Sequence, residues 1–269
     1  MIGNGVRHPA VAGLFYPSDP HSLATMVDSF LRAAPEPEPG RPAPVALIVP
    51  HAGYRYSGPV AATAYKRLES RPGELRRVVI AGPSHRVLLR GLAAPAASTF
   101  LTPLGPVPVD EQLRAAASRH RGVIVDDRPH AVEHSLEVQL PFLQRVLGTD
   151  GWTVLPLAVG EAAPRTVADV LESLLDDETL LVLSTDLSHY EPYAAAREHD
   201  ARTAAAVLRK QPDAIGPTDA CGAYPLNGLL ELARRRDLDL DLLDLRNSGD
   251  TEGDRYRVVG YGAFAVTRR

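Results

Sequence analysis

The chain has 269 residues, of which 45% are hydrophobic, so it is long enough to bury a sizeable core. Lys and Arg total 29 against 33 Asp and Glu, and no basic block is long enough to follow a phosphate backbone, so we expect no nucleic-acid partner. No window approaches the roughly 20 apolar residues that cross a bilayer, and the first residues lack an apolar signal core, so we expect a cytoplasmic protein with no membrane association.

Short apolar runs alternate with longer segments of helical periodicity. Runs rich in Val, Ile and Leu are typical of strands buried on both faces. The predicted strands are 45–49, 77–81, 123–125, 153–159, 180–183 and 257–266, with a further strand at 237–245 that keeps one face in water. The predicted helices are 21–31, 59–67, 110–120, 135–147 with a kink at Pro141, 164–175, 193–208 and 225–236.

The proline-rich segment 33–42 predicts a surface loop between the first helix and the first core strand. The alternation that follows this loop predicts an α/β fold, a three-layer α/β/α sandwich. We expect its central sheet to be mixed and mainly parallel.

Three predicted strands run into histidines. VALIVP is followed by His51, RVVIAGPS by His85 and LLVLSTDLS by His189. Ligands of open α/β sheets bind outside the carboxyl ends of the strands, so these three imidazoles can converge although they are far apart in sequence. A single histidine after a strand is most often an ordinary loop residue, but three in the same topological position favour a metal or acid–base site.

Asp186 and Cys221 are further candidates with two interpretations each. Asp186 either caps the turn after its strand or, three residues before His189, orients an imidazole or faces a metal. Cys221 precedes the helix that Pro225 can start, and a helix N-terminus favours the thiolate form. The alternative is that this single cysteine is a small buried hydrophobic residue.

The segment 128–137 holds two glutamates and a histidine just before a predicted helix. Carboxylates at a helix start usually complement the helix dipole, so we interpret Glu133 and Glu137 as structural. His134 is a candidate catalytic residue.

Seven motifs in order resemble the Memo family (mediator of cell motility), the B component of the prokaryotic AmmeMemoRadiSam grouping. The motifs are RHPAVAGLFYP (7–17), PHAGYRYSG (50–58), GPSH (82–85), EHSLEVQLPFL (133–143), STDLSHY (184–190), CGAYP (221–225) and NSGDTEGDRYRVVGYGAFAV (247–266). The resemblance covers nearly the whole chain and therefore implies a single Memo-like domain over residues 1–269.

The resemblance implies a fold like that of class III extradiol dioxygenases, whose non-haem iron lies at the carboxyl edge of the sheet. It implies that His51, His85 and Cys221 are metal ligands and that Asp186 and His189 lie beside them, with His189 in the position of the dioxygenase acid–base histidine. A thiolate replaces the usual carboxylate of a two-His-one-carboxylate triad, and this ligand set suits Fe(II), Cu(I) or Zn(II).

Three functions are compatible with these residues. The first is a metal-dependent oxidoreductase with Fe(II) as its expected metal and His189, Asp186 and His134 as catalytic residues. The second is a non-catalytic protein that holds a metal, a small molecule or a peptide in the pocket and docks AMMECR-type and radical SAM proteins, as the resemblance implies. The third is a Ser/His/Asp or Cys/His hydrolase, which we rank last because no Gly-x-Ser-x-Gly elbow occurs.

Overall fold

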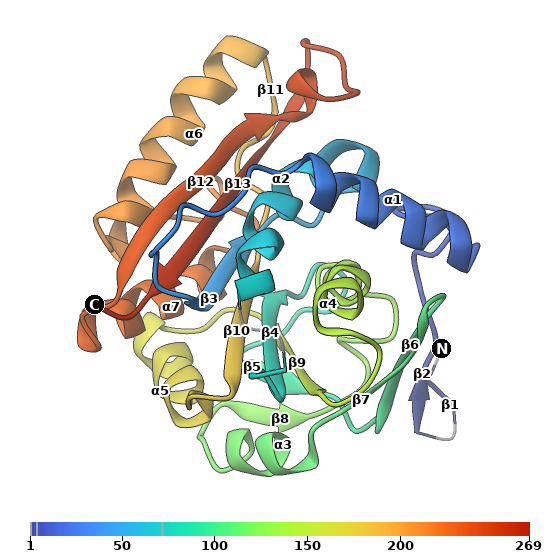
Figure 1. Cartoon of the computed structure of the whole chain (residues 1–269). Coiled ribbons are helices and arrows are strands. Elements are labelled where there is room, and N and C mark those ends of the chain that lie inside the picture. The colour runs from blue at the N-terminus through green and yellow to red at the C-terminus, as the bar shows by residue number, and fades with distance from the viewer. Residues whose placement is uncertain (1, 4, 71–72) are drawn as a thin grey trace.

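Two layers of helices enclose a mixed β-sheet in the computed structural model of the chain, which describes residues 2–3, 5–70 and 73–269 (Figure 1). The helices are α1 (Pro20–Ala33), α2 (Tyr54–Tyr65), α3 (Glu111–Ala117), α4 (Leu140–Leu147), α5 (Pro164–Leu174), α6 (Tyr193–Leu208) and α7 (Ala223–Arg235). The strands of the large sheet are β3 (Pro44–Val49), β4 (Arg77–Pro83), β5 (Leu92–Ala94), β8 (Val123–Val125), β9 (Thr153–Val159), β10 (Thr179–Ser184), β11 (His189–Glu191), β12 (Asp239–Asn247) and β13 (Val258–Thr267). A smaller sheet contains β1 (Ile2–Gly3), β2 (Val6–Arg7), β6 (Thr99–Thr102) and β7 (Gly105–Pro108).

The large sheet has a parallel centre and antiparallel margins. Its strand order is β11-β13-β3-β10-β4-β9-β5-β8, and β12 pairs with β13. The four central strands β3, β10, β4 and β9 are parallel, whereas β13 and β5 run antiparallel to their inner neighbours. Every residue of β3 and β10 is buried, as expected of strands covered on both faces. The predicted three-layer α/β/α sandwich with a mixed sheet is confirmed.

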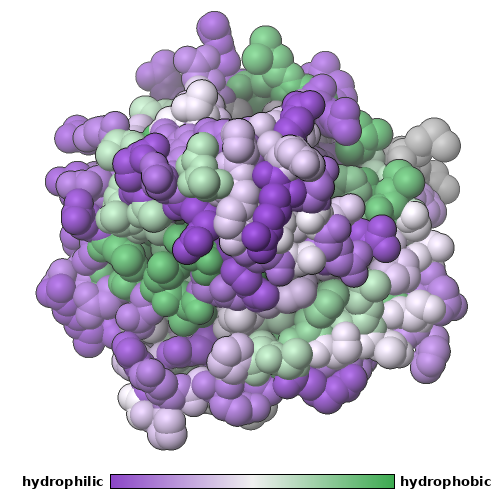
Figure 2. Space-filling model, turned by 90° about the horizontal axis from the view of Figure 1, so that it is seen from above, coloured by the Kyte–Doolittle hydropathy of each residue, from purple (hydrophilic) through white to green (hydrophobic). Residues whose placement is uncertain are grey.

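Amphipathic helices form the two outer layers. α1, α2 and α4 pack together on one face, and α5 and α7 pack together on the other, where α7 contacts β4 and β10 (Figure 1). In α1 the buried side chains are Leu23, Val27 and Leu31, which are four residues apart and so share one face of the helix. The face shown in Figure 2 is mainly hydrophilic, with apolar side chains confined to patches. No helix in the described part of the chain is long and apolar enough to cross a membrane.

The predicted helix boundaries are wrong at two prolines. α4 begins at Leu140 and places Pro141 in its first turn, so Pro141 does not kink a longer helix; the preceding residues 137–139 form a 3₁₀ turn. α2 begins at Tyr54 and contains Pro59, which we had placed at the helix start. The strands β1, β2, β5, β6, β7 and β11, each two to four residues long, have no counterpart in the prediction.

The strand order brings distant segments to one edge of the sheet. β10 lies between β3 and β4, and Ser184 at the end of β10 is level with Val49 at the end of β3. Because the three strands are parallel, the residues that follow them emerge side by side at the same edge. The loops that carry His51, His85 and Asp186 are therefore neighbours, as predicted.

Candidate metal centre

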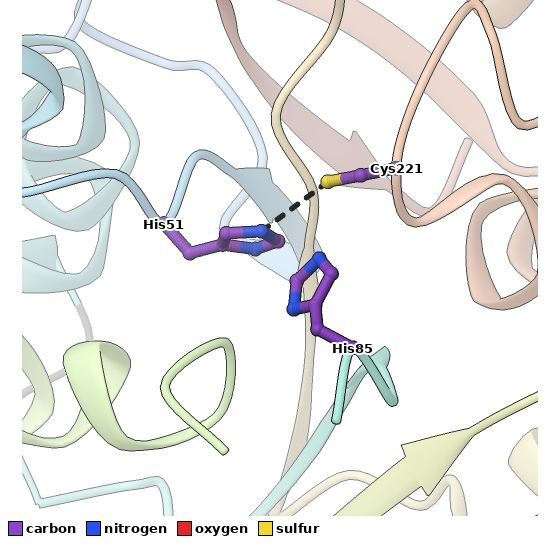
Figure 3. Close-up of side chains that lie close together, drawn as sticks. All are labelled: His51, His85 and Cys221. Carbon is purple, nitrogen blue, oxygen red and sulfur yellow. Dashed lines mark hydrogen bonds between the residues drawn. The ribbon is translucent and has the colours of Figure 1, made fainter. Parts of the chain in front are cut away.

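Three potential ligand atoms converge at this edge. The side chains of His51, His85 and Cys221 point toward one another from three separate segments (Figure 3), and one nitrogen or sulfur atom of each lies within 4.8 Å of the others. His51 Nε2 is 3.2 Å from Cys221 Sγ. The sequence prediction named these three residues, and the structure brings all three together.

Hydrogen bonds fix the ring of His51 with Nε2 facing the Cys221 sulfur. Ser184 Oγ donates to the carbonyl of Ser135 at 2.6 Å and accepts from Gln139 Nε2 at 2.8 Å, so its remaining lone pair accepts from His51 Nδ1 at 2.9 Å. Burial, reinforced by the nearby His134 and His85, lowers the pKa of His51 well below its usual value. The ring is therefore neutral, with its proton on Nδ1 and the lone pair of Nε2 directed at the Cys221 thiol, 3.2 Å away.

Glu133 orients His85 in the same way. One carboxylate oxygen lies 2.9 Å from His85 Nδ1, and the other accepts the backbone N–H of His85 at 2.6 Å. Burial alone raises the pKa of Glu133, but the hydrogen bonds and charge of His85, together with the N–H of Ser135, lower it to about 2. The carboxylate is ionised and holds the proton of His85 on Nδ1, which leaves Nε2 available.

Our structural interpretation of Glu133 as a helix-start residue was wrong. α4 begins only at Leu140, and the carboxylate of Glu133 contacts the candidate ligand His85 instead. His85, Glu133 and His134 also form a second group with metal-binding side chains. The oxygen of Glu133 that faces His85 Nδ1 already accepts the N–H groups of His134 and Ser135, so Glu133 acts as an orienting residue.

A close backbone approach places Cys221 in the centre. The N–H of Cys221 donates to the carbonyl of Asp186 at 3.2 Å, and the N–H of Asp186 lies 3.3 Å from Cys221 Sγ. A Cβ on Gly222 would lie 2.7 Å from Thr185 Cβ and 2.8 Å from the Ser184 carbonyl oxygen, so only glycine fits at this position.

Of the two interpretations of Cys221, burial outweighs the helix N-terminus in the protein without a cation. Burial, followed by the nearby Asp186, raises the pKa of the thiol to about 12. A bound cation reverses this balance because metal coordination deprotonates a thiol. Deprotonation of Cys221 is therefore expected to accompany metal binding.

The residues present fit a metal ion. A tetrahedral ion about 2.0 Å from nitrogen and 2.3 Å from sulfur separates its ligands by about 3.3–3.6 Å. The His51–Cys221 separation of 3.2 Å is already close to this value, and both histidines have their other ring nitrogen committed to a hydrogen bond. Two imidazoles and a thiolate are suitable for iron, copper or zinc, and the geometry does not select among them.

Asp186 orients the backbone of His51 and not the ring of His189. Its carboxylate accepts the N–H of His51 at 2.7 Å, and burial raises its pKa. His189 Nδ1 instead bonds to the carbonyl of Leu187 at 2.8 Å, so Asp186 does not fix the tautomer of His189, which was one of its two candidate roles. The described residues that could hold a metal together do not include Asp186.

The other two predicted catalytic residues line the same cavity as the three candidate ligands. This cavity has a volume of about 1170 Å³ and is bordered by His134, Asp186 and His189. Burial lowers the pKa of His134 to about 4, and its ring stacks on His85 with the centroids 4.8 Å apart. His189 is exposed, and its Nδ1 donates to the Leu187 carbonyl, so the lone pair of the neutral ring lies on Nε2.

The structure does not assemble the serine hydrolase constellation. Ser84 Oγ donates to the carbonyl of Val87, and Ser188 Oγ is buried without a partner among the described residues. His189 Nδ1 is bonded to a main-chain carbonyl and not to Asp186. A serine, a histidine and an aspartate linked in series are therefore absent from this part of the described chain.

Buried polar residues that the sequence analysis did not single out support the centre. Gln139 holds Ser184, and the Tyr65 hydroxyl donates to Gln139 at 2.9 Å. Glu137, interpreted above as a structural residue, is fully buried, pairs with Arg7 and accepts the Tyr16 hydroxyl. The sequence does contain a clue to the role of these polar residues, because Glu137 and Gln139 interrupt the apolar segment 135–147, where a polar side chain is expected to be buried with a partner.

Comparisons with known proteins agree with this arrangement. A family model described as Memo-like protein matches residues 7–265. A MEMO1 family protein from Methanopyrus kandleri is 36% identical, covering 97% of this chain and 99% of the relative. A MEMO1 family protein from Aquifex aeolicus is also 36% identical, covering 95% of this chain and 97% of the relative.

A crystal structure of an uncharacterized protein from Escherichia coli K12 has the same fold, with a TM-score of 0.52 at 15% identity. The match covers 81% of this chain and 98% of that one. The family model and the curated relatives extend over nearly the full length and include the segments that carry His51, His85 and Cys221. The chain therefore belongs to the Memo-like family.

Proposed function

We propose that this chain is a metal-dependent oxidoreductase whose resident metal is a non-haem iron ion bound by His51, His85 and Cys221. The observation that carries the proposal is the convergence of three potential ligand atoms at one end of a large cavity. Both imidazoles have Nδ1 committed to a hydrogen bond, so Nε2 is the potential ligand atom of each. Copper is the second candidate metal, because a thiolate with two imidazoles is also a suitable ligand set for Cu(I).

The other polar residues of the cavity are suited to move protons. Iron bound by His51, His85 and Cys221 would supply a redox-active Lewis acid. His189 Nε2 accepts a proton from a substrate hydroxyl, while the Leu187 carbonyl holds its Nδ1 proton. His134 is neutral at pH 7 because burial lowers its pKa, so its ring can accept a hydrogen bond from substrate.

Metal loading tests the ligand assignment without an activity assay. We expect His51→Ala to abolish stoichiometric iron uptake by anaerobically purified protein while leaving the circular dichroism spectrum unchanged. His21→Ala is the matched control because His21 is an exposed histidine of α1 outside the metal cluster. A His51→Ala protein that still binds iron stoichiometrically contradicts the assignment.

Oxygen consumption tests the enzymatic part of the proposal. Iron-loaded protein should consume oxygen in the presence of a catechol or another small reductant, and His189→Gln should slow this reaction while retaining iron. Loss of turnover with retained metal separates the proton-transfer role of His189 from metal binding. Iron-loaded protein that consumes no oxygen with any of these reductants counts against an oxidoreductase.

Exposed apolar residues next to the cavity favour a second candidate, a docking component for AMMECR-type and radical SAM proteins. Leu14, Leu88 and Val132 are 81%, 98% and 55% exposed. Each belongs to a segment that also lines the cavity, through Phe15, His85 or His134. A contiguous apolar patch beside a cavity is typical of an interaction site, and these three side chains are the ones that we propose to form it.

Co-purification tests this second candidate. A docking component should form a stable complex with an AMMECR-type and a radical SAM protein, and the double change Leu88→Ser and Val132→Ser should weaken that complex. Ile124→Ser is the control, because Ile124 is an exposed apolar residue of β8 that does not line the cavity. A complex that forms equally well with the double variant contradicts the assigned surface.

A further inference from the structure

We propose that the cavity of the metal centre carries a carboxylate-binding subsite, with Arg257 as the bidentate partner and Arg86 as a second positive charge across the cavity, so that the cavity selects small organic acids. Both arginines line the cavity that holds His51, His85 and Cys221. This inference rests on the proposed function, because it concerns the ligand of the same cavity. It adds a substrate class, since the metal centre alone does not distinguish a charged ligand from a neutral one.

The two guanidinium groups have no carboxylate partner among the described residues, whereas two of the four carboxylates that line the cavity are paired with a cationic side chain and the other two accept backbone N–H groups. Glu191 lies 2.8 Å from His199 Nδ1, and Glu252 lies 3.0 Å from Arg55. Asp254 accepts the backbone N–H groups of Tyr256 and Arg257. Asp186 lies deeper, bonded to the N–H of His51. The cavity therefore presents cationic groups that are available to a ligand.

An aromatic ring holds Arg257 in place. The guanidinium carbon of Arg257 lies 5.0 Å from the centroid of the Tyr190 ring, within the range of a cation–π contact. This contact leaves the N–H groups at the guanidinium edge free for a planar, bidentate partner, which a carboxylate provides. Tyr190 also packs edge-on against His189, with the ring centroids 5.8 Å apart, so the arginine site adjoins the candidate proton acceptor.

The backbone of Tyr190 supports a functional role for this ring. Tyr190 is 62% exposed and has a φ of 60°, a left-handed conformation that costs a non-glycine residue free energy. Because the ring is exposed, its burial does not offset the free-energy cost of this backbone conformation. The conformation instead places the face of the Tyr190 ring against Arg257. The strained residue and the unpaired cation thus lie together in the lining of the cavity.

Arg86 supplies the second positive charge. It directly follows the candidate ligand His85, and its charge is one of the factors that lower the pKa of His134. Arg86 therefore lies on the His85–His134 side of the cavity, whereas Arg257 lies on the His189–Tyr190 side. A ligand that carries an oxygen donor toward the metal and a carboxylate toward Arg257 satisfies both parts of the cavity.

Two isosteric probes test the proposal, 3,4-dihydroxybenzoate and its neutral analogue 3,4-dihydroxybenzamide. Calorimetric titration should show that the wild-type protein binds the benzoate about tenfold or more tightly than the benzamide, as one or two charge-assisted hydrogen bonds predict. Arg257→Gln and Arg86→Gln should each lower affinity for the benzoate and leave the benzamide unchanged. Tyr190→Leu should weaken benzoate binding, whereas Tyr190→Phe should not.

Control arms separate this proposal from the metal assignment and from general electrostatics. The titrations use both iron-loaded and chelator-stripped protein. If the protein still binds the benzoate more tightly than the benzamide without iron, the subsite is supported even if the metal assignment is wrong. Arg90→Gln is the charge-matched control, because Arg90 is exposed and lies outside the cavity. Equal binding of both probes, or competition by inorganic phosphate as strong as that by the benzoate, overturns the carboxylate subsite.

Discussion

Each imidazole of the candidate centre is oriented by a buried hydrogen-bond acceptor. Ser184 accepts from His51, and Glu133 accepts from His85, in both cases at Nδ1. The two acceptors differ in charge, since one is a hydroxyl and the other an ionised carboxylate. We therefore expect the His85 side of the centre to be more sensitive to substitution, because hydrogen bonds to charged groups are the stronger ones.

Glu133→Gln should lower metal affinity by about 10–100-fold, the usual effect of losing the orienting partner of a histidine ligand. An amide cannot accept from both His85 N–H and His85 Nδ1–H at once, because one of its two heavy atoms is a donor. Competition titration with a chelator measures the affinity. Glu161→Gln, a change at an exposed glutamate that faces Arg90, should have no effect. Unchanged metal affinity in Glu133→Gln contradicts the orienting role.

At the scale of elements, the loop before α7 must lie directly on the end of β10 for the centre to form. Gly222 allows this contact, and the Gly222 N–H donates to Thr185 Oγ1 at 2.8 Å. Asp219 in the same loop lies 2.7 Å from His199 of α6, and His199 Nδ1 is 2.8 Å from Glu191 of β11. His199 therefore connects the segments that carry Cys221 and His189.

Gly222→Ala should separate the loop from β10 and weaken metal binding. The added methyl group meets the backbone oxygen of Ser184 as well as the Thr185 side chain, so relief requires a main-chain shift, with an expected cost of about 1–3 kcal/mol in stability. Gly216→Ala in the same loop is the control, because its nearest contact would be at an ordinary 3.5 Å. Equal thermal stability and metal affinity in the two variants would falsify this account of the loop.

His199→Gln should reduce stability in a pH-dependent way. Hydrogen bonds and charges from Asp219 and Glu191 raise the pKa of His199 in the folded protein. A raised folded pKa stabilises the protein fully below the unfolded value of about 6.5, and this contribution is lost as pH rises through the folded pKa. Denaturant titrations should show a difference of about 1–2 kcal/mol between wild type and variant at acidic pH that shrinks at alkaline pH. A constant difference across this range is the contrary result.

At the scale of the whole molecule, the order β3-β10-β4 creates the site. It places the ends of three parallel strands side by side and so brings together His51, Asp186 and His85, which are distant in sequence. Cys221 lies just before α7. This helix packs on β4 and β10 from the face of the sheet opposite to α2, and so it brings Cys221 to the same edge. The centre therefore depends on the complete sandwich and not on one local motif.

Much of this arrangement was predictable because it follows from apolar periodicity and from the edge at which parallel strands end. The apolar runs at β3, β4 and β10 are confirmed as strands, and the histidines that follow two of them converge. The role of Glu133 was not predictable, because its contact with His85 depends on how the loop of residues 129–139 folds back over β4. The protonation state of Cys221 depends on burial, which its place before α7 does not reveal.

Metal analysis of anaerobically purified wild-type and Cys221→Ser proteins tests the central claim most directly. The account predicts stoichiometric metal in the wild type, with thiolate-to-metal charge-transfer absorption after Co(II) substitution, because metal binding deprotonates a thiol whose pKa is otherwise raised. The Cys221→Ser protein should lose the absorption band and most of its metal. Wild-type metal content and affinity in Cys221→Ser would contradict the assignment of Cys221 as a ligand and return it to a packing role.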